Sequence, residues 1–193
     1  MKRTILLLVL IALATAACGA NDDPTVSASD ESSSEQQAHN DADLTFVHGM
    51  IPHHEQAIGM ADMVIARGES PEVKGLAERI KAAQTPEIEL MRGWLEQWGE
   101  GEMPSGSDAE HGGTMMSDAD IAELDTARGA ALDKLFLEMM IRHHEGAISM
   151  AEEELDNGEF EAALELAQTI SDTQQSEITE MKALLTETAG PAS

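Results

Sequence analysis

Two short segments of the sequence bring thioether and imidazole side chains together at helical spacing. The first reads FVHGMIPHHEQAIGM over 46–60, and the second reads FLEMMIRHHEGAISM over 136–150. Each contains a His-His pair, with a methionine three residues before the first histidine and another seven residues after it. Residues at these spacings lie on the same side of an α-helix. Thioether and imidazole groups together form a soft donor set, which suits Cu(I) or Ag(I).

A glutamate occupies the apolar face of the helix that follows each of these segments. Glu87 lies at the centre of one such face, and Glu177 takes the same place in the other. A carboxylate in an apolar stripe is costly to bury unless it is paired or binds a metal. The candidate metal ligands are therefore Met50, His53, His54, Met60, Glu87, Met91, Met140, His143, His144, Met150, Glu177 and Met181.

These residues also admit an interpretation without a metal. The histidines and glutamates would then form buried hydrogen bonds, with methionine as a flexible filler of the core. A lone histidine on a helix favours that interpretation. Here the His-His pair is doubled and accompanied by thioethers at one-turn spacing, and this combination favours a metal site.

The two segments belong to a long internal repeat. A shift of 90 residues aligns 46–98 with 136–188 without a gap, which indicates two copies of one supersecondary unit. In each copy, apolar residues recur at a 3.6-residue period on two helices separated by a glycine-containing turn. One hairpin cannot bury its apolar face alone, so we expect an all-α four-helix bundle over 44–188. Its helices are predicted near 44–67, 72–98, 130–156 and 160–187.

The segment that joins the repeats, 99–116, is rich in glycine and has two interpretations. Its soft side chains are Met103, His111, Met115 and Met116. They are either a further donor set or chance residues of a solvated loop. Ser117 followed by Asp120 is typical of a helix N-terminus, so we expect a short helix between Ser117 and Gly129.

The first 17 residues are typical of an export signal. A basic start is followed by the apolar stretch 5–14, which is too short to span a bilayer, and small residues surround Cys18. This pattern resembles a bacterial lipoprotein signal, in which the cysteine becomes the lipidated first residue, although Thr15 stands where leucine is usual. The alternative is an ordinary signal peptide with an incidental cysteine. We expect residues 1–17 to be removed and Cys18 to be lipidated.

The composition limits the classes of function. The chain has 37 acidic and 11 basic residues and a formal net charge of −26, and residues 18–43 are acidic with few apolar side chains. We expect a disordered linker there, holding the folded domain at the outer face of the cell envelope, in the periplasm or at the cell surface. Nucleic-acid binding needs basic side chains and is therefore excluded. The sequence shows no Ser or Cys nucleophile arranged with a base, so nothing in it indicates a hydrolase.

The two His-His segments resemble the paired signatures of domain-of-unknown-function family 305. The likeness covers about 43–188 and includes the methionine-rich segment between the repeats. Members of that family have a ferritin-like helical bundle, are often exported and include periplasmic copper-binding proteins. The resemblance therefore implies a ferritin-like four-helix bundle. It also implies copper ligands at Met50, His53, His54, Met60, Met140, His143, His144 and Met150.

Three functions remain open from the sequence. The first is a non-catalytic, membrane-tethered protein that sequesters or transfers Cu(I) or Ag(I). The second is a ferritin-like oxidoreductase with an iron, manganese or zinc centre built from His54, Glu87, His144 and Glu177. The third is an envelope interaction module whose polar core only sets the helix register. Di-iron bundles use Glu-x-x-His, and the absence of that spacing here favours the first function over the second.

Overall fold

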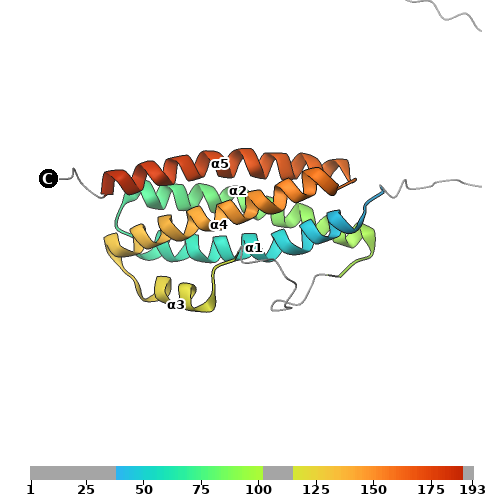
Figure 1. Cartoon of the computed structure of the whole chain (residues 1–193). Coiled ribbons are helices and arrows are strands. Elements are labelled where there is room, and N and C mark those ends of the chain that lie inside the picture. Colours follow the sequence, from blue (N-terminus) through green and yellow to red (C-terminus); the bar gives the residue numbers. More distant parts are fainter. Residues whose placement is uncertain (1–37, 102–114, 189–193) are drawn as a thin grey trace, which may run out of the picture. The chain divides into compact units, whose positions relative to one another are not determined.

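Four long helices and one short helix make up most of the computed structural model, which describes residues 38–101 and 115–188 (Figure 1). They are α1 (Asp41–Arg67), α2 (Pro71–Trp98), α3 (Asp118–Thr126), α4 (Gly129–Asn157) and α5 (Glu161–Thr188). Helices α1 and α2 form one hairpin, α4 and α5 form the other, and α1 packs along α4. The described ranges contain no strand. The predicted all-α four-helix bundle of two repeated hairpins is confirmed.

Helix α1 begins at Asp41, three residues before the predicted start. The side chain of Asn40 accepts hydrogen bonds from the amides of Ala42 and Asp43, and the Asp43 carboxylate accepts one from the amide of Asn40. This capping box satisfies amide groups that have no partner within the helix. The last residues of the predicted linker therefore belong to the bundle. The short helix predicted after Ser117 is present as α3, with the same kind of cap.

Several predictions concern residues outside the described ranges. The export signal at 1–17, the lipidated Cys18 and most of the 18–43 linker lie there, as do Met103 and His111. Among the helices that the structure describes, none combines the length and the apolar character needed to cross a membrane. The signal, the lipid anchor and the linker stay predictions.

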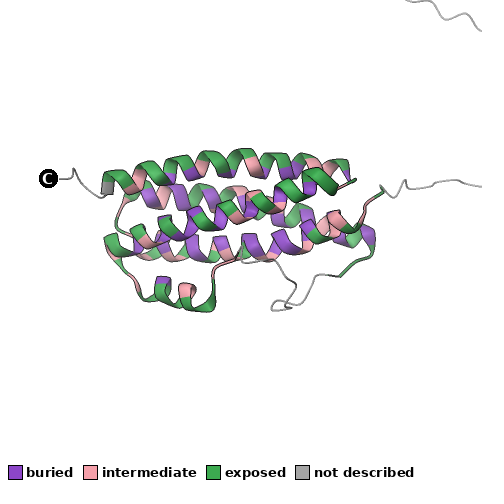
Figure 2. Cartoon of the chain, viewed as in Figure 1, coloured by how far each residue is buried: buried purple, intermediate pink, exposed green. Residues whose placement is uncertain are grey.

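Buried positions recur along the long helices (Figure 2), and the apolar side chains among them form two clusters. The first cluster joins the second half of α1 to the first half of α4, with Val64 and Phe136 among its members. The second cluster joins the first half of α1 to the second half of α4, with Val47 and Ala151 among its members. Each cluster takes residues from both hairpins, so the hairpins stabilise each other by burying a shared apolar surface.

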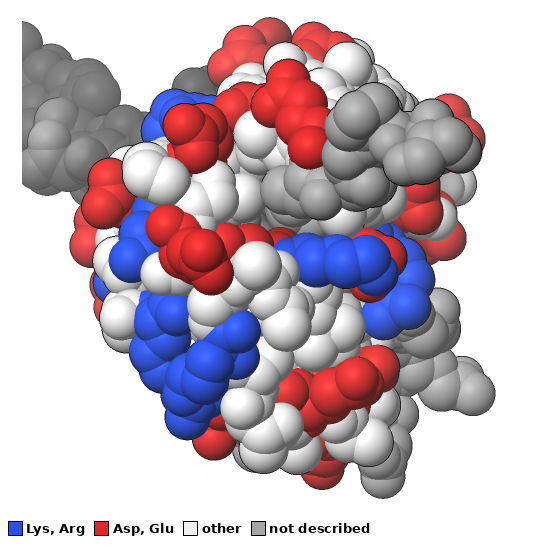
Figure 3. Space-filling view, turned by 90° about the vertical axis from the view of Figure 1, so that its left-hand side faces the viewer, with Lys and Arg blue, Asp and Glu red and all other residues white. Residues whose placement is uncertain are grey.

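Charged side chains lie on the outside of the bundle. Figure 3 shows Lys and Arg among Asp and Glu on the end that faces left in Figure 1. Several of these charges form exposed ion pairs, such as Arg67 with Asp125 at 3.0 Å and Lys134 with Glu138 at 2.7 Å. Exposed pairs contribute about 0–1 kcal/mol each, so stability comes mainly from the two clusters.

The first helix of each hairpin caps the second helix of the other hairpin. Asp133, near the start of α4, accepts hydrogen bonds from the amides of Glu69 and Ser70, at 3.0 and 2.7 Å, just before α2 begins. Gly68 allows this approach, because a Cβ atom there would collide with the Asp133 carboxylate. The contact ties the start of α2 to the second hairpin.

Asp43 makes the corresponding contact at the other end, 90 residues earlier in the sequence. Its carboxylate accepts from the amides of Glu159 and Phe160, at 3.2 and 3.0 Å, just before α5. Burial by itself would raise the pKa of Asp43. Hydrogen bonds from the Asn40 amide and these two amides, together with the nearby Glu154 carboxyl, outweigh burial and lower that pKa.

Glu154 breaks the symmetry between the two ends, because the matching residue of the first repeat is Val64. Both side chains are buried, and Glu154 faces Asp43. Burial, followed by the nearby Asp43 carboxylate, raises the pKa of Glu154 to about 8. Glu154 is therefore largely protonated at neutral pH.

Replacing Glu154 with valine should reduce the dependence of folding stability on pH. The ordinary pKa of the carboxyl is 4.5, and in the folded chain it is about 8. The stabilisation from this proton is fully present below pH 4.5 and is lost as the pH rises through 8. Between pH 5 and 9 the parent should lose as much as about 4 kcal/mol relative to Glu154→Val.

Urea unfolding followed by circular dichroism at the two pH values measures this difference. Glu152→Val, at an exposed position of the same helix, is the matched control and should keep the pH dependence of the parent. An unchanged pH dependence in Glu154→Val would contradict the prediction.

Candidate metal centre

The four histidines of the two His-His pairs lie buried between the helices. Helix α1 positions His53 and His54, α4 positions His143 and His144, and no side chain of the four is more than 1% exposed. The rings of His53 and His143 contact each other, with centroids 3.7 Å apart and planes inclined by 34°. These two residues are equivalent positions of the repeat, so their contact lies where the two repeats meet.

The second histidine of each pair is hydrogen-bonded to a glutamate on the neighbouring helix. Nε2 of His54 lies 2.7 Å from Oε2 of Glu87, and Nε2 of His144 lies 2.8 Å from Oε2 of Glu177. The two glutamate side chains are 16% and 13% exposed. Each central glutamate thus lies within hydrogen-bonding distance of a histidine of the facing helix, which both the metal interpretation and the interpretation without a metal allow.

The four histidines, the two glutamates and the nearby Gln84 and Gln174 are called the polar layer below. Several of its buried atoms have no hydrogen-bonding partner among the described residues. They are Nδ1 of His54 and His144, both ring nitrogens of His143, and Oε1 of Gln84 and Gln174. A buried polar atom left without a partner costs about 1–3 kcal/mol. Lone pairs on imidazole nitrogens and amide oxygens attract cations, so the layer is suited to bind one.

Burial keeps His143 in the form that binds metals. Burial first, and then the neighbouring His53, His144 and His54, hold the pKa of His143 well below the usual 6.5. A neutral imidazole at physiological pH retains a lone pair, and a metal ion need not displace a second proton from it.

The methionines lie in two groups, one in each apolar cluster. The first cluster contains Met60, Met140 and Met181, and the second contains Met50, Met91 and Met150. The motif spacing places Met50 and Met60 together beside His53, and the structure corrects this grouping. Ten helical residues separate Met50 from Met60 by about 15 Å along the axis, so one ion cannot contact both.

No three His, Cys, Asp or Glu side chains are grouped to hold a metal ion within the described ranges. Glu87 and Glu177 each contact their own histidine instead of a common point. An ion in the polar layer therefore needs donors beyond these four residue types. Methionine sulfurs are such donors, and Met50 and Met140 each lie one helical turn before the first histidine of a pair.

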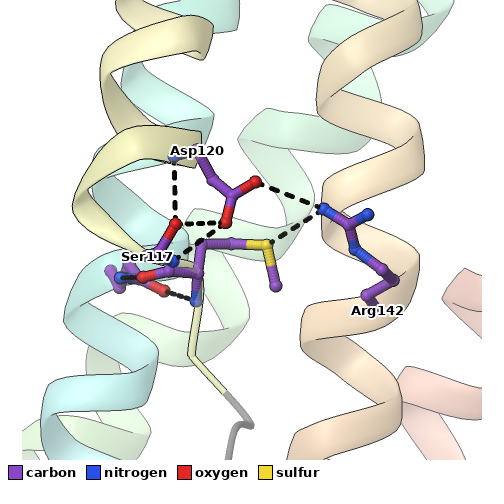
Figure 4. Close-up of polar contacts among 5 residues, drawn as sticks. Ser117, Asp120 and Arg142 are labelled. Atoms are coloured by element: carbon purple, nitrogen blue, oxygen red, sulfur yellow. Dashed lines mark hydrogen bonds and ion pairs between the residues drawn. The ribbon is translucent and has the colours of Figure 1, made fainter.

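The end of the segment between the repeats is held across α1 and α4. Gln56 exchanges two hydrogen bonds with the backbone of Met116, at 2.9 and 2.8 Å. Arg142 donates to the Met116 sulfur at 3.6 Å and pairs with Asp120 at 3.8 Å, and Asp120 also accepts from Ser117 (Figure 4). Met116 thus has a structural role. Spacing along single helices gave no signal for Gln56 or Arg142, because both contacts join distant parts of the chain.

The fold and the polar layer define an all-α bundle with buried histidines and methionines at the junction of two repeats. The family model described as Domain of unknown function (DUF305) matches residues 43–185. The chain belongs to this family, and the resemblance of the two His-His segments is confirmed.

Solved structures of the same family share the fold. A putative secreted DUF305 protein from Streptomyces coelicolor is 31% identical with a TM-score of 0.72, covering 77% of this chain and 92% of that chain. A DUF305 fragment from Deinococcus radiodurans is 32% identical with a TM-score of 0.70, covering 77% and 97%. CopM in its Cu(II)-bound form is 35% identical with a TM-score of 0.66, covering 75% and 96%.

CopM has also been solved with other metals, in a Cu(I)-bound form and an Ag-bound form that are 34% and 33% identical to this chain. A curated relative is an uncharacterised protein of Acanthamoeba polyphaga mimivirus. It is 38% identical over 55 residues, which are 28% of this chain and 36% of that protein. The chain therefore matches about a third of the length of that relative.

Proposed function

We propose that this chain is a non-catalytic, exported protein that sequesters or transfers Cu(I) or Ag(I) in the cell envelope. The polar layer carries the proposal, because buried ring nitrogens of His54, His143 and His144 have no partner among the described residues and lie between two methionine groups. Imidazole and thioether donors favour soft cations. CopM, which matches three quarters of this chain, holds Cu(I), Cu(II) or Ag in its solved structures and supports the same metals here.

The two repeats supply equivalent donors. His53 and His143 meet at the repeat junction, with Met50 and Met140 one turn away. Met91 and Met150 lie in the cluster of Met50, whereas Met60 and Met181 lie in the cluster of Met140. Soft donors therefore lie on both sides of the histidines, and their burial excludes water and competing chelators from the cargo ion.

The hard-metal oxidoreductase is less well supported. Its four expected ligands form two separate pairs, His54 with Glu87 and His144 with Glu177, instead of one cluster. An iron, manganese or zinc centre would have to break both hydrogen bonds to gather these side chains. Copper binding uses nitrogen atoms that are already unpartnered.

The double variant Met50→Leu/Met140→Leu should bind Cu(I) at least about tenfold more weakly than the parent, a loss of about 1.4 kcal/mol. One soft donor is removed from each methionine group, whereas leucine keeps the volume, so folding should lose less than about 1.5 kcal/mol. Competition with a chromophoric Cu(I) chelator measures the affinity. The parent should prefer Cu(I) to Fe(II) and Mn(II), and replacing His53 and His143 should weaken binding further.

Met139→Leu is the matched control for the thioethers. Met139 is as deeply buried as Met140, but the first repeat has Gly49 at the matching position. If the double variant binds Cu(I) as tightly as this control, the methionines are packing residues and the carboxylate–histidine centre becomes the better interpretation.

We also propose that residues 1–17 direct export and that Cys18 carries a lipid anchor. The proposal rests on the sequence alone: a basic start, a short apolar stretch and small residues around the single cysteine. The acidic residues after Cys18 would then separate the metal-binding bundle from the membrane. The putative secreted relative from Streptomyces coelicolor is consistent with export.

Cys18→Ser should move the mature protein from the membrane fraction to the soluble fraction of the cell envelope. The lipid would be the main apolar anchor, because the described helices are unsuited to cross a membrane. Ultracentrifugation of envelope fractions followed by immunoblotting measures the distribution. Thr15→Leu, which restores the usual lipoprotein residue, should stay with the membrane. Equal partitioning of the parent and Cys18→Ser would rule out the anchor.

A further inference from the structure

We propose that Glu87 and Glu177 are positioning residues for the metal centre and not metal ligands. Each holds its histidine in the tautomer that carries the proton on Nε2, so that Nδ1 keeps its lone pair on the buried side of the ring. The role of this lone pair toward a metal rests on the proposed function. The tautomer itself rests on the geometry of the metal-free chain.

The two hydrogen bonds determine which ring nitrogen carries the proton. A carboxylate oxygen offers only lone pairs, so the nitrogen 2.7 Å from Oε2 of Glu87 must donate, and that nitrogen is Nε2 of His54. His144 and Glu177 repeat the arrangement at 2.8 Å. A neutral imidazole has one proton, so Nδ1 of each ring is left as an acceptor.

The depth of each carboxylate suits this role. The glutamate side chains keep 16% and 13% of their surface exposed, whereas the histidines that they contact are fully buried. Contact with water lowers the cost of keeping a negative charge, and the imidazole N–H stabilises that charge further. Each glutamate therefore orients its ring from the periphery of the bundle without reaching the centre.

The buried side of each ring offers Nδ1 no protein partner. No described group donates to Nδ1 of His54 or His144, and Oε1 of Gln84 and Gln174 is buried without a donor in the same way. These glutamines lie one turn before Glu87 and Glu177. The polar layer thus holds buried acceptor atoms to which no described N–H or O–H group donates. A cation bound there would interact with their lone pairs.

The arrangement matches the usual support of a metal-binding histidine. Such a histidine binds the ion through one ring nitrogen and donates the other N–H to a carboxylate, which fixes the ring and increases its basicity. The described residues contain this pairing twice, at positions 90 residues apart, and none of their carboxylates contacts a ring nitrogen of His143. His143 and His144 therefore have different roles.

Nitrogen-15 NMR of the histidine rings in the metal-free chain tests the tautomer directly. We expect a protonated Nε2 and an unprotonated Nδ1 for His54 and His144 at neutral pH. In Glu87→Gln/Glu177→Gln the amide can accept from Nε2 or donate to it, so the single tautomer should give way to a mixture.

Glu55→Gln/Glu145→Gln is the matched control. It removes the same two charges from residues next to the histidines, where Glu55 pairs with Arg92 and Glu145 pairs with Lys182 at the surface. The control should keep the tautomers of the parent. Competition with a Cu(I) chelator should show binding about 10- to 100-fold weaker in Glu87→Gln/Glu177→Gln. The control should change by less than about fivefold.

Two results would overturn the inference. One is a proton on Nδ1 of His54 or His144 in the parent. The other is a Cu(I) affinity of Glu87→Gln/Glu177→Gln equal to that of the control, although its tautomers have changed. The tautomer would then have no effect on metal binding. If the parent does not bind Cu(I), the proposed function fails, and the tautomer measurement alone decides whether the carboxylates fix the rings.

Discussion

The burial of four imidazole rings where two repeats meet is the constraint on which the rest of the structure depends. A bundle interior does not accommodate polar groups without partners at low cost. Glu87 and Glu177 therefore contact two of the rings from the neighbouring helices, and His53 and His143 pack on each other. The apolar clusters draw on both hairpins, so this layer exists only when the hairpins are packed together. Folding and assembly of the candidate metal centre are thus one event.

The ends of the bundle hold the hairpins in the register that the histidines need. Asp133 caps α2 from the second hairpin, and Asp43 caps α5 from the first. The middle keeps the symmetry of the repeat, whereas one end has lost it through Glu154 in place of Val64. The titration of Glu154 beside Asp43 therefore adds a pH dependence to one end, and the histidine layer retains equivalent donors from each repeat.

Much of this architecture could be predicted from the sequence. The gap-free repeat and the 3.6-residue period predicted the helices and the bundle, and the phase of Glu87 placed its carboxylate on the inner face of its helix, where it contacts a histidine. The period gives the direction of a side chain but not its neighbours across the bundle. Grouping Met50 with Met60 failed because ten residues of one helix separate them by about 15 Å along its axis, and they lie in different clusters. The contacts of Met116 and Glu154 also join distant segments, and no local pattern marks them.

The distribution of donors bears on how such a protein handles a cargo ion. A ring whose Nδ1 is already unprotonated binds a cation without first releasing a proton. The required tautomer is therefore set when the chain folds and the histidine contacts its glutamate. Thioethers on both sides of the histidines provide soft donors without charge. A buried centre of neutral donors favours a cation of low charge, because hydrated divalent ions lose more solvation on entry. The two glutamates stay near the surface, where their charges orient the rings without entering the centre. This separation of charge from donors favours Cu(I) or Ag(I) over iron.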